Sequence, residues 1–123
     1  MHSQILSCAW LAAALLAAPV YADTPVPVQN EVNYLLGYIA GSGCEFNRNG
    51  SWYSAQKAQS HLRDKYKYLA GRNLADTTEH FIERGASESS LTGVAYQIRC
   101  GSHAPVASGP WLREKLAELR AAP

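Results

Sequence analysis

Two cysteines, Cys44 and Cys100, set the strongest limit on how this chain folds. A bond between them would close a loop of about 55 residues and would add about 4 kcal/mol to stability by the chain-entropy relation. The alternative is a pair of free thiols with a redox or metal-binding role, although the sequence has no CxxC motif. The choice depends on the compartment, because disulfides persist where conditions are oxidising.

The N-terminal segment predicts that the chain is exported. Residues 5–20 form an apolar run rich in Leu and Ala, and Val20-Tyr21-Ala22 offers small residues where a signal peptidase reads. We therefore expect residues 1–22 to be a signal peptide that is cleaved after Ala22 and takes Cys8 with it. The two remaining cysteines of an exported chain are most simply one disulfide.

The mature chain has about 100 residues, which is enough for one small domain. We assign residues 23–123 to a single domain, with residues 23–28 as a flexible leader because two prolines interrupt any periodicity there. The formal net charge of +1 gives no strong attraction to nucleic acid or anionic lipid. No later apolar run is long enough to span a membrane. We expect neither a nucleic-acid partner nor a membrane span after cleavage.

Apolar periodicity and turn residues predict the first elements. Asn30 is a candidate N-cap for a helix that ends at Gly41 or Gly43 and buries one apolar face: Val32, Leu35, Leu36 and Ile39. Two short strands at residues 44–48 and 51–53 flank Asn49-Gly50, the pair that best tolerates positive φ at both centres of a type I′ turn. A β-hairpin is therefore expected.

The rest of the chain predicts three more helices and one strand. Ser54 caps a helix that ends near Gly71, and a third helix covers residues 77–85 with Asp76 and Glu79 as a capping box. Residues 94–100 look like a strand. Ser108 caps the last helix, with Pro110 in its first turn. The order α-β-β-α-α-β-α describes an α+β domain with about four helices around a short antiparallel sheet.

The segment Ser54-Ala55-Gln56-Lys57 matches the SxxK pattern of penicillin-recognising serine enzymes. Those enzymes are much larger and need further motifs that this chain lacks. Ser54 also stands where an N-cap serine belongs, directly before an apolar-periodic helix. We therefore interpret Ser54 as a cap and assign no catalytic residue.

His61 and Lys65 share one face of the same helix, because residues four apart lie one turn apart. Helical spacing extends their row to Ser54, Tyr68 and Arg72. The competing interpretation is an ordinary amphipathic boundary, in which long side chains cover apolar surface. Our hypothesis is a binding groove formed with the strand that leads to Cys100, with these candidate residues: His61, Lys65, Tyr68, Tyr96 and Arg99.

Catalysis or metal binding at His61 would require further groups. A general base needs an orienting carboxylate, for which Asp64 and Glu79 are the candidates. His80 and His103 have no zinc-ligand spacing to each other or to His61. The sequence predicts no metal site and no cofactor.

Several spaced motifs resemble the YfeK-like family of small exported bacterial proteins, a domain of unknown function. The matching pieces cover nearly the whole mature chain: Gly43-Cys44, Phe46, Arg48-Asn49-Gly50, Tyr53-Ser54, His61-Leu62, Lys65-Tyr66, Ser90, Gly93, Tyr96, Arg99-Cys100 and Trp111-Leu112. The resemblance implies a Gram-negative periplasmic location and a Cys44–Cys100 disulfide. It implies no activity and no catalytic residues.

The function hypotheses therefore rest on the pattern of side chains. The first is a non-catalytic periplasmic domain that binds an envelope ligand or a protein partner. The second is a small cell-envelope hydrolase centred on His61 and Lys65 that acts on peptidoglycan or peptide. The third is a secreted enzyme inhibitor. An enzyme needs polar side chains that converge in one cleft, whereas a binding domain needs only an exposed groove.

Overall fold

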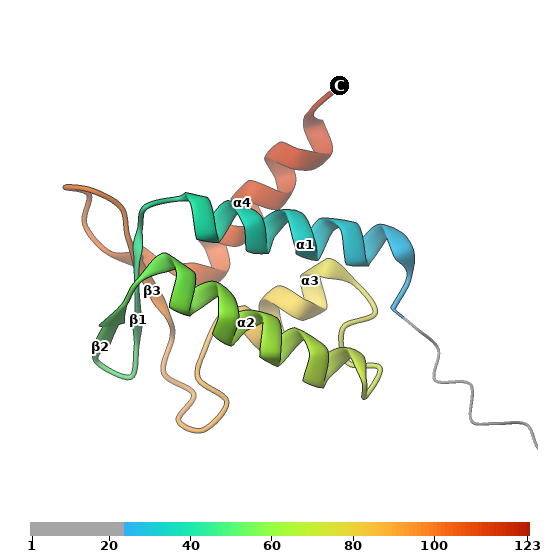
Figure 1. Cartoon of the computed structure of the whole chain (residues 1–123), viewed down its shortest axis with the longest axis horizontal. Helices are drawn as coiled ribbons and strands as arrows, with labels where there is room; N and C mark the ends of the chain where they lie inside the picture. Colours follow the sequence, from blue (N-terminus) through green and yellow to red (C-terminus); the bar gives the residue numbers. More distant parts are fainter. Residues whose placement is uncertain (1–23) are drawn as a thin grey trace, which may run out of the picture.

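The computed structural model describes residues 24–123. The predicted signal peptide and Cys8 lie outside this range. Helix α1 (Val26–Gly41) and helix α2 (Ala55–Ala70) lie side by side, and a small sheet stands at one end of the pair (Figure 1). The chain continues through α3 (Thr78–Phe81), a π-helical turn η1 (Ile82–Ala86) and α4 (Ser108–Ala121). The predicted α+β class is confirmed.

The sheet has four antiparallel strands in the order β2-β1-β3-β4. These are β1 (Glu45–Arg48), β2 (Ser51–Tyr53), β3 (Gln97–Arg99) and β4 (Val106–Ala107). Phe46 pairs with Tyr53 on one side and with Ile98 on the other. Strand β4 was not among the predicted elements, which included no strand between residue 100 and the last helix. This strand has only two residues and follows a proline, so the segment is too short to show the apolar–polar alternation that predicts a strand.

The turn between β1 and β2 has the predicted type I′ conformation. Asn49 has φ of 52° and Gly50 has φ of 88°, so both central residues adopt the left-handed region. The Asn47 side chain accepts a hydrogen bond from the Gly50 amide at 3.0 Å. This turn fixes the register that places Arg48 opposite Ser51.

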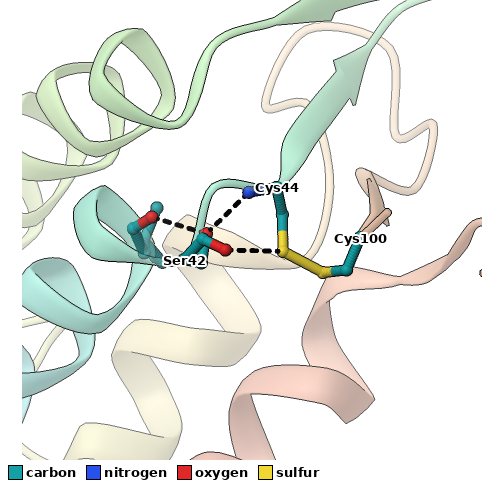
Figure 2. Close-up of a disulfide and its surroundings, with 4 residues drawn as sticks. Ser42, Cys44 and Cys100 are labelled. Atoms are coloured by element: carbon teal, nitrogen blue, oxygen red, sulfur yellow. Dashed lines mark hydrogen bonds between the residues drawn. A yellow bond between two sulfur atoms is a disulfide. The ribbon is translucent and has the colours of Figure 1, made fainter. Parts of the chain in front are cut away.

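The predicted disulfide joins Cys44 to Cys100 across the start of β1 and the end of β3 (Figure 2). The same corner is held by Ser42, which follows the last turn of α1. Its hydroxyl donates to the Ile39 carbonyl at 2.7 Å and accepts from the Cys44 amide at 3.1 Å. Helix α1 and the sheet are therefore connected by a rigid corner.

One hydrophobic core lies between the helices and the inner face of the sheet. Helix α1 contributes the four residues predicted from its periodicity, and α2 contributes Ala58, Leu62 and Leu69. Tyr66 stacks on Phe81 with ring centroids 5.4 Å apart. Trp111 packs edge-on against Phe46 and near Tyr38. The remaining core residues include Phe81, Ile82, Tyr96, Ile98, Leu112 and Leu116.

Three predicted helix caps are wrong. Helix α1 begins at Val26 after Pro25, so Asn30 lies in its second turn and residues 26–28 of the expected leader are helical. Pro27 is compatible with the first turn, where its missing amide costs nothing. The α3 cap is Thr77, which accepts from the His80 amide at 3.0 Å, while Asp76 contacts the His80 ring instead.

The third wrong cap is Ser108. It lies inside α4, and the residue at the cap position is Ala107. The buried Ser108 hydroxyl donates to the Ala86 carbonyl at 2.6 Å, at the end of η1. Its hydrogen bond therefore joins two elements instead of ending one.

Candidate functional site

Helix α2 carries the first half of the site. Ser54 adopts an extended conformation before it, and its hydroxyl accepts a hydrogen bond from the Lys57 amide at 3.3 Å. The cap interpretation of Ser54 is confirmed. Leu62 turns toward the core, so His61 lies at the border of the apolar face, and Lys65 follows one turn later.

Tyr96, which directly precedes β3, supplies the second half of the site. Its ring is buried and its main chain is fixed, because its amide bonds to Ser87 and its carbonyl to Ser108. Its phenolic oxygen lies 3.2 Å from Nε2 of His61 and 3.1 Å from Nζ of Lys65. The structure therefore brings together three of the five predicted site residues.

Arg48 is a fourth member that the sequence analysis missed. It ends β1, and its Nη1 lies 3.3 Å from Nδ1 of His61. A guanidinium only donates, so Nδ1 of His61 must be the acceptor and the ring proton is on Nε2. Nε2 then donates to the oxygen of Tyr96, which also accepts from Lys65. The available signal was strand alternation, which puts Arg48 on the inner face with Phe46.

The electrostatics of this cluster keep His61 neutral. Burial lowers the pKa of His61, and the charges of Arg48 and Lys65 lower it further, against an opposing effect of Asp64. Burial also lowers the pKa of Lys65, assisted by Arg48 and opposed by Glu88, whose carbonyl accepts from Nζ at 3.1 Å. The pKa of Tyr96 is raised by burial, against the effect of Arg48. The phenol therefore stays protonated at neutral pH.

A pocket of about 160 Å³ opens between the hairpin and α2, beside this cluster. Its apolar lining comes from β1 and α2, and Arg48, His61 and the hydroxyl-bearing ring of Tyr96 stand at its polar side. The complete lining is Phe46, Asn47, Arg48, Tyr53, Lys57, Ala58, His61, Leu62 and Tyr96. A concave apolar site with a few convergent polar groups is the usual form of a small-ligand site.

A second hollow lies on the other side of His61. It is lined by His61, Asp64, Lys65, Tyr68, Leu69, Arg84 and Ser90. Tyr68 therefore borders this hollow and is absent from the lining of the pocket. Its exposed ring stacks under the Arg72 guanidinium at 3.9 Å. The helical row of the sequence analysis is thus split, with Ser54 as the cap and Tyr68 and Arg72 paired together.

Arg99 does not join the site. It lies on the opposite face of the sheet, where its guanidinium stacks on the Trp52 ring at 3.9 Å and bonds to Glu45 at 3.0 Å. This placement corrects the expectation that Arg99 and Tyr96 line one groove. Arg99 lies three positions after Tyr96, and side chains an odd number of positions apart in an extended segment point to opposite faces.

The residues considered for catalysis are also placed. Asp64 borders the second hollow and makes no hydrogen bond to His61 among residues 24–123. Glu79 lies elsewhere and contacts Arg120 of α4. Within that same described range, no three His, Cys, Asp or Glu residues gather closely enough to hold a metal ion. None of its helices has the length and apolarity that crossing a membrane requires.

Comparison with known proteins places the chain in a family. Residues 26–120 match the model of DUF5329, a family of unknown function. The chain belongs to this family. The chain is also similar to the uncharacterized protein YfeK of Salmonella typhimurium, to which it is 38% identical over 85 residues. The match covers 68% of this chain and 69% of the relative. No solved structure matches the chain. The predicted resemblance is confirmed.

Proposed function

We propose that this protein is a non-catalytic binding domain of the periplasm and that the pocket between the hairpin and α2 is its ligand site. The observation that carries the proposal is the joined set Arg48–His61–Tyr96–Lys65 at the side of an apolar pocket. Each polar group is held by another, so the cluster is ordered before any ligand arrives. Preorganisation of this kind lowers the cost of binding.

The same hydrogen bonds favour binding over hydrolysis. A histidine that acts as a general base is normally oriented by a carboxylate and faces a nucleophile. In residues 24–123, the hydrogen-bond partners of His61 are Arg48 and Tyr96, and neither is a carboxylate. Ser54, the candidate nucleophile, uses its oxygen to cap α2. No observation favours the inhibitor alternative.

The disulfide and the N-terminal apolar run support the periplasmic location. A Cys44–Cys100 bond persists in an oxidising compartment and would be reduced in the cytoplasm. The location is tested by the intact mass of the protein recovered from a periplasmic extract. We expect a chain that begins near Asp23, and a mass that includes residues 1–22 would contradict export with cleavage.

The binding site is tested by titrating ¹⁵N-labelled protein with a collection of ring-sized fragments, both neutral and charged. We expect amide shifts to gather at the pocket, at Phe46, Ala58 and Leu62. Ala58→Leu places a larger side chain in the pocket and should abolish these shifts. Ser60→Leu adds the same side chain at an exposed position of α2 and should leave them unchanged. Shifts that gather elsewhere, or none at all, would refute the proposed site.

A further inference from the structure

We infer that the pocket takes a monocarboxylate with one ring-sized apolar group, and that Arg48 is the partner of the carboxylate. This inference rests on the proposed function and adds the chemical class of the ligand. It is carried by four features of the pocket: its charge, the unused donors of Arg48, the hydroxyl of Tyr96 and the size of its apolar part.

The charge of the pocket is one-sided. Arg48 and Lys57 are cations in its lining, and among residues 24–123 the lining holds no Asp or Glu. Neither cation has a carboxylate within ion-pair distance in that part of the chain. Three other cations do have such partners: Arg99 with Glu45, Lys115 with Glu118, and Arg120 with Glu31 and Glu79. Exposed cations such as Arg63 and Lys67 have none within residues 24–123, but water screens their charges, whereas Arg48 is half-buried. An anionic ligand would therefore pair with a half-buried charge that the fold leaves open.

Arg48 has hydrogen-bonding capacity to spare. A guanidinium carries five N–H groups, and the side-chain hydrogen bond that the structure gives Arg48 goes to neutral His61. That bond orients the guanidinium without neutralising its charge. The planar arrangement of its N–H groups matches the two oxygens of a carboxylate.

Tyr96 offers a second donor. Its oxygen accepts from His61 and from Lys65, so both lone pairs are engaged and the hydroxyl proton is available for a ligand. Tyr96 also lines the pocket. A carboxylate beside Arg48 can therefore accept from two different groups.

The apolar part of the pocket limits the size of the ligand. Phe46, Ala58 and Leu62 line it, and its volume of about 160 Å³ is close to that of a cavity known to hold benzene. A small inorganic anion would leave this apolar surface unfilled. A plain hydrocarbon would leave Arg48 without a counter-charge. A ligand with both a ring and a carboxylate satisfies both sides of the pocket.

The test compares three probes that share one ring: phenylacetate, phenylacetamide and 2-phenylethylammonium. We expect phenylacetate to bind about tenfold more tightly than phenylacetamide, because a charge-assisted pair replaces a neutral hydrogen bond. The ammonium probe should bind the most weakly. Dissociation constants are measured by NMR titration of the pocket amides in the oxidised protein.

Arg48→Gln should remove the roughly tenfold preference for phenylacetate over phenylacetamide, because the charge that distinguishes the two probes is lost. Arg99→Gln is the matched control, because Arg99 lies on the outer face of the same sheet, and it should leave the preference unchanged. If Arg48→Gln fails to fold, Arg48→Lys replaces it. That variant should keep part of the preference for phenylacetate, since it retains the charge but loses the planar donors.

Two sources can supply this chemistry: a free small acid or the C-terminal residue of a peptide. N-acetyl-alanyl-phenylalanine and its C-terminal amide distinguish them. Tighter binding of the free-carboxylate peptide than of phenylacetate would assign the site to peptide ends. Binding of phenylacetate alone would assign it to free acids, and either result supports the inference.

The inference and the proposed function fail in different ways. Equal affinity for phenylacetate and phenylacetamide at the pocket amides would overturn the inference and leave the pocket as a binding site. An Arg48→Gln variant that folds and keeps full preference for phenylacetate would also overturn it. The absence of pocket shifts with every probe and every fragment would overturn both.

Discussion

Nε2 of His61 lies 3.2 Å from the phenolic oxygen of Tyr96, although the two residues are 35 positions apart in the chain. This contact joins α2 to the segment that enters β3. The hydrogen bonds of His61 to Arg48 and Tyr96 form together only when His61 is neutral, because Nδ1 must stay unprotonated to accept from Arg48. The site is therefore coupled to pH through a single ring.

The free energy of unfolding should fall as the pH drops below about 6.5. The pKa of His61 is lower in the folded protein than its ordinary 6.5, through burial and then the charges of Arg48 and Lys65. The unfolded chain therefore binds more protons between the two pKa values, so stability falls as the pH is lowered through that window. Stability from neutral His61 is fully present above about 6.5. Urea unfolding at pH 7.5, 6.5 and 5.5 measures it.

His61→Gln should flatten this dependence over the same range of pH. His103→Gln is the control, because His103 is exposed in the loop after Cys100, and it should keep the wild-type slope. Equal slopes for His61→Gln and wild type would show that His61 protonation does not limit stability.

Loss of the Cys44–Cys100 bond should lower the free energy of unfolding by about 2–5 kcal/mol, the range found for native disulfides of small secreted domains. Urea unfolding of Cys100→Ser measures the effect. The double variant Cys44→Ser/Cys100→Ser should not respond to reductant. Two thiols that react with an alkylating reagent in untreated, oxidised protein would contradict the bond.

Ser54→Ala should cost about 1 kcal/mol of stability, because the Lys57 amide loses the oxygen that it bonds to. Ser54→Asp should retain most of the stability, since Asp is an equally good cap. Ser60→Ala, at an exposed position inside the same helix, should have little effect. Labelling of Ser54 by a fluorophosphonate probe would contradict the structural role.

Two helical glycines should respond to alanine in opposite directions. Gly37 lies on the exposed side of α1 with no atom within 4 Å of an added Cβ, so Gly37→Ala should stabilise by about 0.5–1 kcal/mol. At Gly109 an added Cβ would lie 2.6 Å from Oγ of Ser87. That hydroxyl is held by the Ile82 carbonyl at 2.6 Å. Gly109→Ala should therefore destabilise by about 1–3 kcal/mol. Thermal unfolding of both variants tests the pair.

Apolar periodicity predicted the helices well, because the residues that repeat at helical spacing are the same residues that the fold buries. Val32, Leu35, Leu36 and Ile39 are all buried, as the sequence indicated. The Asn49-Gly50 turn was equally predictable, since positive φ at two successive residues suits few other pairs. These signals are local and depend on the chain's own backbone geometry.

Several of the wrong predictions concern polar groups whose partners are distant in sequence. Ser108 looked like a cap, but its hydroxyl serves the Ala86 carbonyl, 22 residues away. Alternation along each strand was a usable signal for both arginines, since Arg48 shares a face with Phe46 and Arg99 lies three positions from Tyr96. Which other residues that face meets depends on the pairing of β1 with β3, and sequence spacing alone does not contain this pairing.

The position of the disulfide affects how the site assembles during folding. Every residue that lines the pocket, from Phe46 to Tyr96, lies between Cys44 and Cys100, whereas α1 and α4 lie outside them. In the oxidised chain these residues form a covalent ring, so Tyr96 meets His61 within an already restricted search. Forming the contact between Tyr96 and His61 then costs less chain entropy than it would in a linear chain. Oxidation before folding should therefore speed the encounter of α2 with β3, while the two outer helices still have to dock from open ends.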